Sequence, residues 1–263
     1  MAERRRERDR AGFSEESWKK HMALRALVRA QLAVLNLRRT KGAIIDMHAS
    51  NGNGVELPQK DMFRDTESKS SARIAAEEAA GCTPYADVIL CESNKKRRDQ
   101  LKEIFSDSAM ILASNRQLLR MDLRTYGWLL VLNDPCGHSG HAIDVLAHIR
   151  RQVPRSDFII SFNEGSLGRH LGVRRQADDS ASEAAGHLDR TKACRAATEK
   201  YMWMRDHTAW ATKLGKKHVV RTIGISGRKG FKGRLLLVTD YVAEGLRNMR
   251  RLEWLTAPTR RTP

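Results

Sequence analysis

The sequence lacks the long apolar runs of a membrane protein: no segment reaches the roughly 18 to 20 uninterrupted apolar residues that span a bilayer. The opening residues, MAERRRERDR, also lack the apolar centre of a signal peptide. Cysteine is scarce, with four residues and no CxxC pair, so neither a disulfide framework nor a zinc ribbon is indicated. We therefore expect an intracellular, cytoplasmic protein with reduced thiols and no membrane association.

Acidic residues are the smaller share of the charge. The 31 Asp and Glu residues are outnumbered by 48 Lys and Arg residues, which gives a formal net charge of +17 and a pI near 10.2. A field of this size attracts polyanions and favours contact with phosphate backbones. The charge predicts nucleic acid as the partner, with compositional bias or an anionic membrane surface as the alternative readings.

The chain divides into a short arm and one domain. Residues 1–13 alternate Arg with Glu and Asp, carry almost nothing apolar, and predict a disordered basic arm. From Ser14 to Arg39 apolar residues recur at helical spacing, which predicts one long amphipathic helix or two short ones. We expect residues 14–263 to form a single domain with this N-terminal helix and a basic C-terminal part.

Short apolar runs follow the first helix and alternate with helical patterns. Such runs are typical of strands that are buried on both faces of a parallel sheet, and they lie at residues 43–45, 86–91, 109–113, 128–132 and 157–162. The helical patterns cover residues 72–80, 94–105, 142–151 and 188–210. Two last runs, 218–224 and 233–240, are joined without a helix and are expected to be antiparallel neighbours. The predicted fold class is α/β: a Rossmann-like, mostly parallel sheet with helices on both faces and an antiparallel last strand.

Polar residues stand directly after several of these runs. In open α/β sheets ligands collect at the carboxyl ends of the strands. The first such segment reads Asp46-Met-His-Ala-Ser-Asn-Gly52. Taken alone, a turn rich in Gly and Asn is usually just a turn. It gains meaning from the residues that end the next strands, which are Glu92, Ser114, Asn115 and the segment 133–136.

The Asp46–Gly52 segment resembles the D-x-F-A-G-x-G motif of class I S-adenosylmethionine-dependent methyltransferases. Ser50 stands at the first glycine of that motif and Gly52 at the second. The resemblance implies that S-adenosylmethionine is the cofactor and that this loop holds it, through Asp46, His48, Ala49, Ser50, Asn51 and Gly52. Ser50 is a departure that is tolerable only if its position does not require a positive φ.

The next strand ends extend the resemblance. Glu92 would bind the two ribose hydroxyls of the cofactor, whereas the alternative is a surface glutamate that caps the helix beginning at Asn94. Ser114 or Asn115 would hydrogen-bond the adenine amino group in the same family. The separation of Asp46 and Glu92 exceeds the roughly 20 residues usual in NAD-binding folds, and a G-x-G-x-x-G motif is absent, which disfavours a dehydrogenase.

The segment Asn133-Asp134-Pro135-Cys136-Gly137 resembles the [D/N/S]-P-P-[Y/F/W] motif of amino-methyltransferases that act on adenine or cytosine amines. The resemblance implies that Asp134 and the backbone carbonyl of a proline accept hydrogen bonds from the target amine. We take Asn133, Asp134, Pro135 and Cys136 as the candidate catalytic residues. Because Gly137 replaces the aromatic residue, the stacking partner of the base must come from elsewhere, with Phe162, Tyr201 and Trp203 as candidates.

Cys136 leaves two other interpretations open. Cytosine-5 methyltransferases place a nucleophilic cysteine directly after a proline, as in Pro135-Cys136, although their partner motifs are not evident here. Cys136 also begins a C-x-H-x-x-H cluster with His138 and His141, but a fourth ligand is missing and we predict no metal site. The departures at Ser50, Cys136 and Gly137 would also fit a nucleic-acid-binding module that has lost catalysis.

A basic turn near the end of the chain completes the candidate sites. Arg228, Lys229, Phe231 and Lys232 combine phosphate-binding charges with an aromatic ring that could insert between bases or simply cover the sheet. We predict a methyltransferase acting on DNA, at adenine N6 and with relaxed sequence preference, with RNA less favoured as substrate. The alternatives are a cytosine-5 enzyme using Cys136 and an inactive nucleic-acid-binding module.

Overall fold

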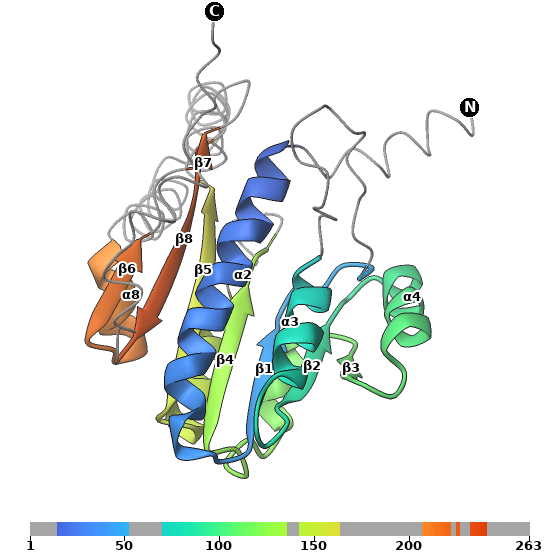
Figure 1. Cartoon of the computed structure of the whole chain (residues 1–263), viewed down its shortest axis with the longest axis horizontal. Helices are drawn as coiled ribbons and strands as arrows, with labels where there is room; N and C mark the ends of the chain where they lie inside the picture. The colour runs from blue at the N-terminus through green and yellow to red at the C-terminus, as the bar shows by residue number, and fades with distance from the viewer. Residues whose placement is uncertain are drawn as a thin grey trace, which may run out of the picture.

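The computed structural model describes residues 15–52, 70–135, 142–163, 207–221, 225–226 and 232–240. Its centre is one sheet in the order β3-β2-β1-β4-β5-β8-β6, with β7 paired to β8 (Figure 1). The strands are β1 (Gly42–Asp46), β2 (Asp87–Cys91), β3 (Met110–Leu112), β4 (Trp128–Asn133), β5 (Ser156–Asn163), β6 (His218–Arg221), β7 (Ile225–Ser226) and β8 (Lys232–Thr239). Strands β1 to β5 are parallel, and β8 runs antiparallel between β5 and β6. The predicted fold class is confirmed.

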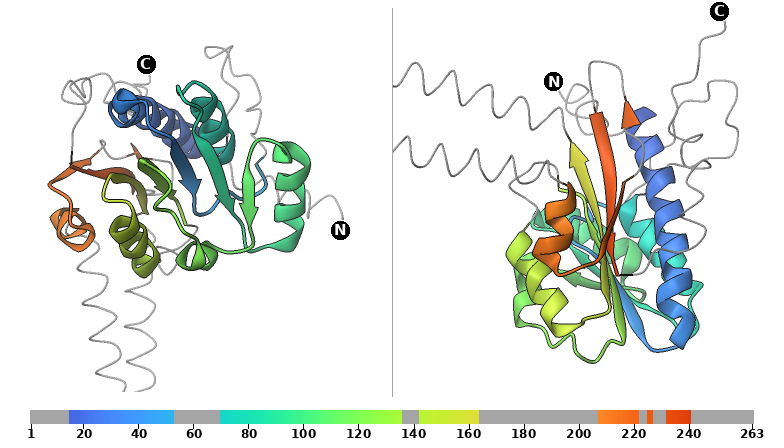
Figure 2. Two further views of the ribbon diagram at one scale, coloured as in Figure 1. Left: turned by 90° about the horizontal axis from the view of Figure 1, so that it is seen from below. Right: turned by 90° about the vertical axis from the view of Figure 1, so that its left-hand side faces the viewer.

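Helices cover both faces of the sheet (Figure 2). They are α2 (Glu15–Leu35), α3 (Ser71–Ala80), α4 (Lys95–Phe105), α5 (Ile143–Gln152) and α8 (His207–Leu214), with the 3-10 helices η1 (Asn36–Arg38) and η2 (Asn115–Arg120). One core includes apolar side chains of α2, α3 and α4, and the other includes those of η2, α5 and α8. None of the described helices combines the length and apolar character needed to cross a bilayer.

The predicted boundaries need a few corrections. The first helix is a single α-helix that ends at Leu35 and continues as η1. The last described helix extends to Leu214, beyond the predicted end at 210, while residues 188–206 lie outside the described part of the chain. Strand β7 was not predicted, because two residues are too short for a detectable period. The predicted arm, residues 1–13, also lies outside the described ranges.

Burial on both sides explains why the strands read as continuous apolar runs. All five residues of β1 are buried, with Ile44 in one core and Ala43 and Ile45 in the other. The first residue of this strand is Gly42, and it must be glycine because the indole of Trp128 lies against it. A Cβ atom at this position would be 1.9 Å from that ring. The first strand is therefore held tightly at the centre of the sheet.

A buried polar network ties the first helix to the last strand, at the edge where the parallel strands begin. Gln31 of α2 donates to Asp157 Oδ2 at 2.6 Å and to Thr239 Oγ1 at 3.2 Å. The fully buried Lys216 side chain lies 2.9 Å from Asp240 Oδ2 and 3.6 Å from Asp157 Oδ1. Buried charges need such partners because water no longer solvates them.

Candidate cofactor and catalytic site

The parallel sheet brings the predicted strand-end carboxylates to one edge. In the register of the sheet, Asp46 at the end of β1 is level with Leu90 of β2 and Leu132 of β4. Glu92 and Asp134 each lie two residues beyond those positions, directly after the strands that flank β1. Both carboxylates are close enough to Asp46 for their charges to raise its pKa. The three acids that were predicted from separate parts of the sequence are therefore neighbours.

The loop after β1 remains attached to the flanking strands. Met47 donates its backbone N–H to Leu132 at 3.0 Å, and Ala49 donates to Cys91 at 3.0 Å. His48 donates its backbone N–H to Asp46 Oδ1 at 3.0 Å. These bonds fix the course of the predicted cofactor loop between β2 and β4.

Two residues of this loop have left-handed backbone conformations. Gly52 has φ +72°, which glycine adopts without strain. Ser50 has φ +55°, so the condition under which serine was considered tolerable at this position is not met. The left-handed region costs a residue with a Cβ atom roughly 1–2 kcal/mol. Ser50 therefore adopts a conformation suited to the glycine of the motif, at a cost in strain.

Replacing Ser50 by glycine is expected to stabilise the protein by about 0.5–1 kcal/mol, since relief of left-handed strain exceeds the entropy that glycine adds to the unfolded chain. Gly52→Ala is the matched control, for which the opposite change in stability is expected. Its Cβ would lie 2.8 Å from both Leu101 and Phe105, at a positive φ, so a loss of about 2–4 kcal/mol is expected. Urea unfolding measures both changes, and a destabilised Ser50→Gly variant would contradict the strain.

The far end of the loop is held by the start of α3. Ser70 donates its hydroxyl to the Gly52 carbonyl at 2.9 Å, and Arg73 Nε donates to the same oxygen at 3.1 Å. Ser70 is also the N-cap of α3, because its hydroxyl oxygen accepts from the Arg73 backbone N–H at 3.3 Å. The position of Gly52 therefore depends on the position of α3.

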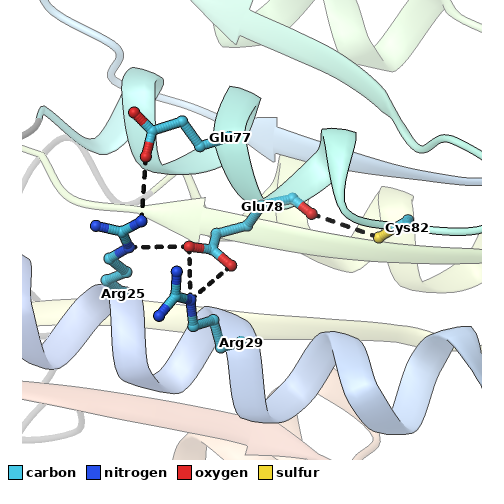
Figure 3. A network of polar contacts seen from close by, with 5 residues as sticks. All are labelled: Arg25, Arg29, Glu77, Glu78 and Cys82. Atoms are coloured by element: carbon cyan, nitrogen blue, oxygen red, sulfur yellow. Dashed lines mark hydrogen bonds and ion pairs between the residues drawn. The ribbon is translucent and has the colours of Figure 1, made fainter.

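Helix α3 is in turn fastened to α2 by two arginines and two glutamates (Figure 3). Arg25 Nε and Arg29 Nε donate to Glu78 Oε1 at 2.9 and 2.8 Å. A second donor of Arg25 reaches Glu77 Oε2 at 3.2 Å. Because Glu78 is only 11% exposed, these charge-assisted bonds are stronger than ordinary surface pairs. The helix that carries Arg25 and Arg29 also reaches the predicted catalytic segment through Lys20.

Asp46 is buried, and burial raises its pKa to about 6, although hydrogen bonds from Ser71 and from the His48 backbone oppose the shift. Nearby Asp134 and Glu92 raise it further. Within the described ranges Asp46 has no ion-pair partner. A cationic ligand such as the ammonium group of S-adenosylmethionine would supply the missing positive charge. This environment fits the predicted cofactor.

The raised pKa of Asp46 predicts a pH-dependent stability. Folding favours the protonated acid, so its contribution is fully present below the ordinary pKa near 3.8 and is lost as the pH rises through about 6. We compare the free energy of unfolding of Asp46→Asn with that of the unmodified protein. The difference should move in favour of the variant by about 2–3 kcal/mol between pH 4 and pH 8, at about 1.4 kcal/mol per pKa unit. Urea unfolding at both pH values tests this. The exposed Asp107→Asn is the control, and an equal effect at the two pH values would contradict the prediction.

The residues predicted to bind the cofactor after β2 and β3 also take part in capping the helices that follow. Glu92 is half-buried, and its Oε1 atom accepts the backbone N–H of Asn94 at 2.7 Å, so the capping alternative is partly realised. Asn94 itself is the N-cap of α4. Ser114 is the N-cap of η2 and accepts from the Arg116 N–H at 3.1 Å, while Asn115 begins that helix. The adenine contact of Ser114 or Asn115 stays a prediction, and the Ser114 hydroxyl already has a capping role.

Asp134 contacts a lysine that was not predicted to belong to the site. Lys20 Nζ of α2 lies 2.6 Å from Asp134 Oδ2, and each side chain is 21% exposed. Burial alone would raise the pKa of Asp134, but the charge and hydrogen bond of Lys20, with a hydrogen bond from Ser161, hold that pKa below its ordinary value. Asp134 is therefore ionised at neutral pH.

His21 lies beside this pair. Burial lowers the pKa of its imidazole to about 4, and the positive charge of Lys20 acts in the same direction, against Asp134. The imidazole is therefore neutral at physiological pH. Lys20 and His21 stand one turn before Leu24, on the buried stripe of α2. Polar residues that continue an apolar stripe are the sequence signal that could have drawn attention to them.

The remaining predicted site residues are described only in part. Asn133 ends β4, is fully buried, and is paired with Ile160, while Pro135 is the last described residue of its segment. Lys232 begins β8 at the edge where β5 ends, since its neighbour Gly233 is paired with Asn163. The other predicted residues lie outside the described ranges, namely Cys136, Arg228, Lys229 and Phe231. Their roles stay predictions, as do those of Tyr201 and Trp203.

Comparison with known proteins gives structural matches alone. The sequence matches no model of a protein family and no curated protein. Protein LPL1258 from Legionella pneumophila is similar in structure, with a TM-score of 0.58, 11% identity, and 93% of each chain covered. Lower scores relate the chain to an rRNA methylase from Streptococcus thermophilus (TM-score 0.38, 9% identity, 76% and 87% covered). A precorrin-6y C5,15-methyltransferase from Geobacter metallireducens is similarly distant (TM-score 0.37, 12% identity, 81% and 87% covered). The first likeness shows the fold alone, which is the Rossmann-like sheet that carries Asp46, Glu92 and Asp134 at one edge.

Proposed function

We propose that the protein is an S-adenosylmethionine-dependent methyltransferase that acts on an exocyclic amine of nucleic acid, with adenine N6 of DNA as the first candidate. The observation that carries the proposal is the ionised Asp134, held by Lys20 at the same sheet edge as the Asp46 loop. In open α/β sheets this edge is where ligands bind. The high positive charge of the chain supports a polyanionic substrate.

The residues around the loop suit S-adenosylmethionine. When bound, the cofactor would supply a methyl group on a positively charged sulfur, open to attack by an amine lone pair. Asp46 would face the ammonium group of the cofactor, and Glu92 would accept hydrogen bonds from the ribose hydroxyls. Gly52 lacks a Cβ atom, so the loop can turn at a positive φ while α4 packs directly against it. The expected cost of replacing Asp46 by Asn is therefore weaker cofactor binding, despite the higher stability at pH 8.

Asp134 and Pro135 would orient the target amine. A carboxylate offers about four acceptor positions, so Lys20 and Ser161 leave room for an N–H of the amine on Asp134. The Pro135 carbonyl is a candidate acceptor for the second N–H. With both N–H groups held, the nitrogen lone pair points out of their plane toward the methyl carbon. As the N–C bond forms, the bond between sulfur and the methyl carbon would break with its electron pair left on sulfur, and the nitrogen would lose a proton, which the ionised Asp134 carboxylate favours.

The deciding experiment is mass spectrometry of nucleosides from DNA and RNA after incubation with the protein and isotope-labelled S-adenosylmethionine. Labelled N6-methyladenine from DNA is the expected product. Labelled 5-methylcytosine, abolished by Cys136→Ser, would replace the proposal with cysteine chemistry. If calorimetry detects no cofactor binding at millimolar concentration, the protein is instead an inactive nucleic-acid-binding module.

A further inference from the structure

Helix α4 presents a group of cations beside the proposed cofactor loop. Its first turn carries Lys95, Lys96 and Arg97, all exposed, at the edge of the sheet where Cys91 ends β2 and Glu92 follows. Lys95 is paired with Asp99 at 2.8 Å. The side chains of Lys96 and Arg97 have no hydrogen-bond or ion-pair partner among the residues that the structure describes. We call Lys95, Lys96 and Arg97 the α4 basic surface.

Local folding accounts for Lys95 through its pair with Asp99, but not for the charges of Lys96 and Arg97. The N-terminal end of a helix carries a partial positive charge, so each cation placed there costs about 0.3–1 kcal/mol at an exposed position. The first turn of α4 contains no acidic residue that would compensate. The Asn94 side chain already caps the helix by accepting from the Arg97 backbone N–H at 3.2 Å. A helix that only had to fold would be more stable with acids at these positions.

The proposed cofactor does not account for them either. S-adenosylmethionine carries a positive sulfur and an ammonium group against one carboxylate, so its net charge is positive and the α4 basic surface repels it. The second substrate of the proposed reaction is a polyanion, for which these charges are complementary. The remaining explanation is contact with the phosphates of that substrate.

The order of the strands gives a lower limit for the distance between the α4 basic surface and Asp134. Leu101 and Phe105 of α4 pack so closely on Gly52 that a Cβ there would be 2.8 Å from each, so the helix lies against the cofactor loop. Strand β2 is two positions from β4 in the sheet, which is roughly 10 Å at about 4.8 Å per strand. Helix α4 lies on the β3 side of β2 (Figure 1), so its basic surface is at least this far from Asp134, which corresponds to about three nucleotides or more at about 3.4 Å per nucleotide.

We propose that the α4 basic surface binds phosphates of the nucleic-acid substrate, at least about three nucleotides from the target base. Because this inference rests on the proposed function, its test measures binding and needs no turnover.

The test compares two double variants with the same change in charge. Lys96→Gln with Arg97→Gln removes two cations from the α4 basic surface. Arg151→Gln with Lys217→Gln removes two exposed cations from the opposite edge, where β5 and β6 begin. Fluorescence anisotropy of a labelled DNA duplex over a series of KCl concentrations gives the dissociation constant and its salt dependence for each protein.

For the α4 pair, the slope of log affinity against log salt should become shallower by about 1.8, at about 0.9 per lost phosphate contact. Affinity at low salt should fall at least tenfold, while the control pair should leave both values near those of the unmodified protein. Equal losses in both pairs would show that general charge alone acts, and would overturn the inference. An unchanged slope in the α4 pair, or no binding of DNA by the unmodified protein, would also overturn it. Binding that depends on α4 without nucleoside methylation would contradict the proposed function alone.

Discussion

Replacing Asp134 by alanine is expected to lower the rate of methyl transfer by about 10³-fold, because the target amine loses the charged acceptor that orients it. Lys20 loses its partner at the same time, but at 21% exposure it can turn toward water, so the fold should survive. Cofactor binding should stay within a few-fold, since Asp46 and Glu92 are unchanged. Single-turnover rates with labelled cofactor, and calorimetry for its binding, separate the two effects.

Lys20→Met is the matched control, because it keeps the carboxylate and removes its cation. Burial then acts on Asp134 without the opposing charge, so the pKa of the carboxyl rises. Methyl transfer should fall on the acidic side and recover as the pH increases, whereas Asp134→Ala should be inactive at every pH. Normal turnover by Asp134→Ala would refute the role given to this residue. An unshifted acidic limb in Lys20→Met would refute the role given to the lysine.

Replacing Lys216 by methionine should lower the free energy of unfolding by about 3–5 kcal/mol, the usual cost of removing one partner from a buried ion pair. The lysine side chain is fully buried between Asp157 and Asp240, and it also donates to the Pro154 carbonyl at 3.1 Å. Without it, two carboxylates face each other with little solvent. Urea unfolding measures the loss. Lys217→Met, one residue later and exposed, should change stability by no more than about 0.5 kcal/mol.

The loss in Lys216→Met should also depend on pH. Burial raises the pKa of Asp157, while Lys216 and hydrogen bonds from Gln31 and Thr239 lower it. Removing the lysine raises the folded-state pKa further, so the stability of the variant is lost as the pH rises through that value. The deficit should therefore be larger at pH 8 than at pH 5. Equal deficits would point to lost packing of the lysine stem rather than to unpaired charge.

Much of the sheet could be predicted because its strands are buried on both faces. Runs such as Ala43–Ile45 and Trp128–Leu132 contain no polar residue, and the helical patterns between them require parallel neighbours. The boundaries of the elements were predicted to within a few residues, because helix caps and sheet pairing determine where each element ends. Strand β7 could not be predicted, since its two residues are ordered by pairing with Lys232 and Gly233.

Only those parts of the candidate site that follow from the order of the strands could be predicted. Once parallel strand order was inferred, Asp46, Glu92 and Asp134 had to meet at one edge, because each follows an adjacent strand. The Lys20–Asp134 pair joins residues 114 positions apart, so the apolar stripe of α2 can mark Lys20 as facing the sheet but cannot give its partner. The positive φ of Ser50 likewise depends on how the loop is bonded to its neighbours rather than on its own residue type.

The contact between α2 and β8 bears on how the protein is made. Gln31 and Thr239 share a hydrogen bond across 208 positions of sequence, and β8 must pair with β5 before that bond can form. During synthesis, this bond cannot form until Thr239 has left the ribosome, whereas the partners of α2 in α3 and β4 are available much earlier. Contacts this distant in sequence slow folding, because a long loop must close before they stabilise anything. The packing of α2 on α3 and β4 can therefore precede its bond to β8, and the buried polar network at the other edge of the sheet closes last.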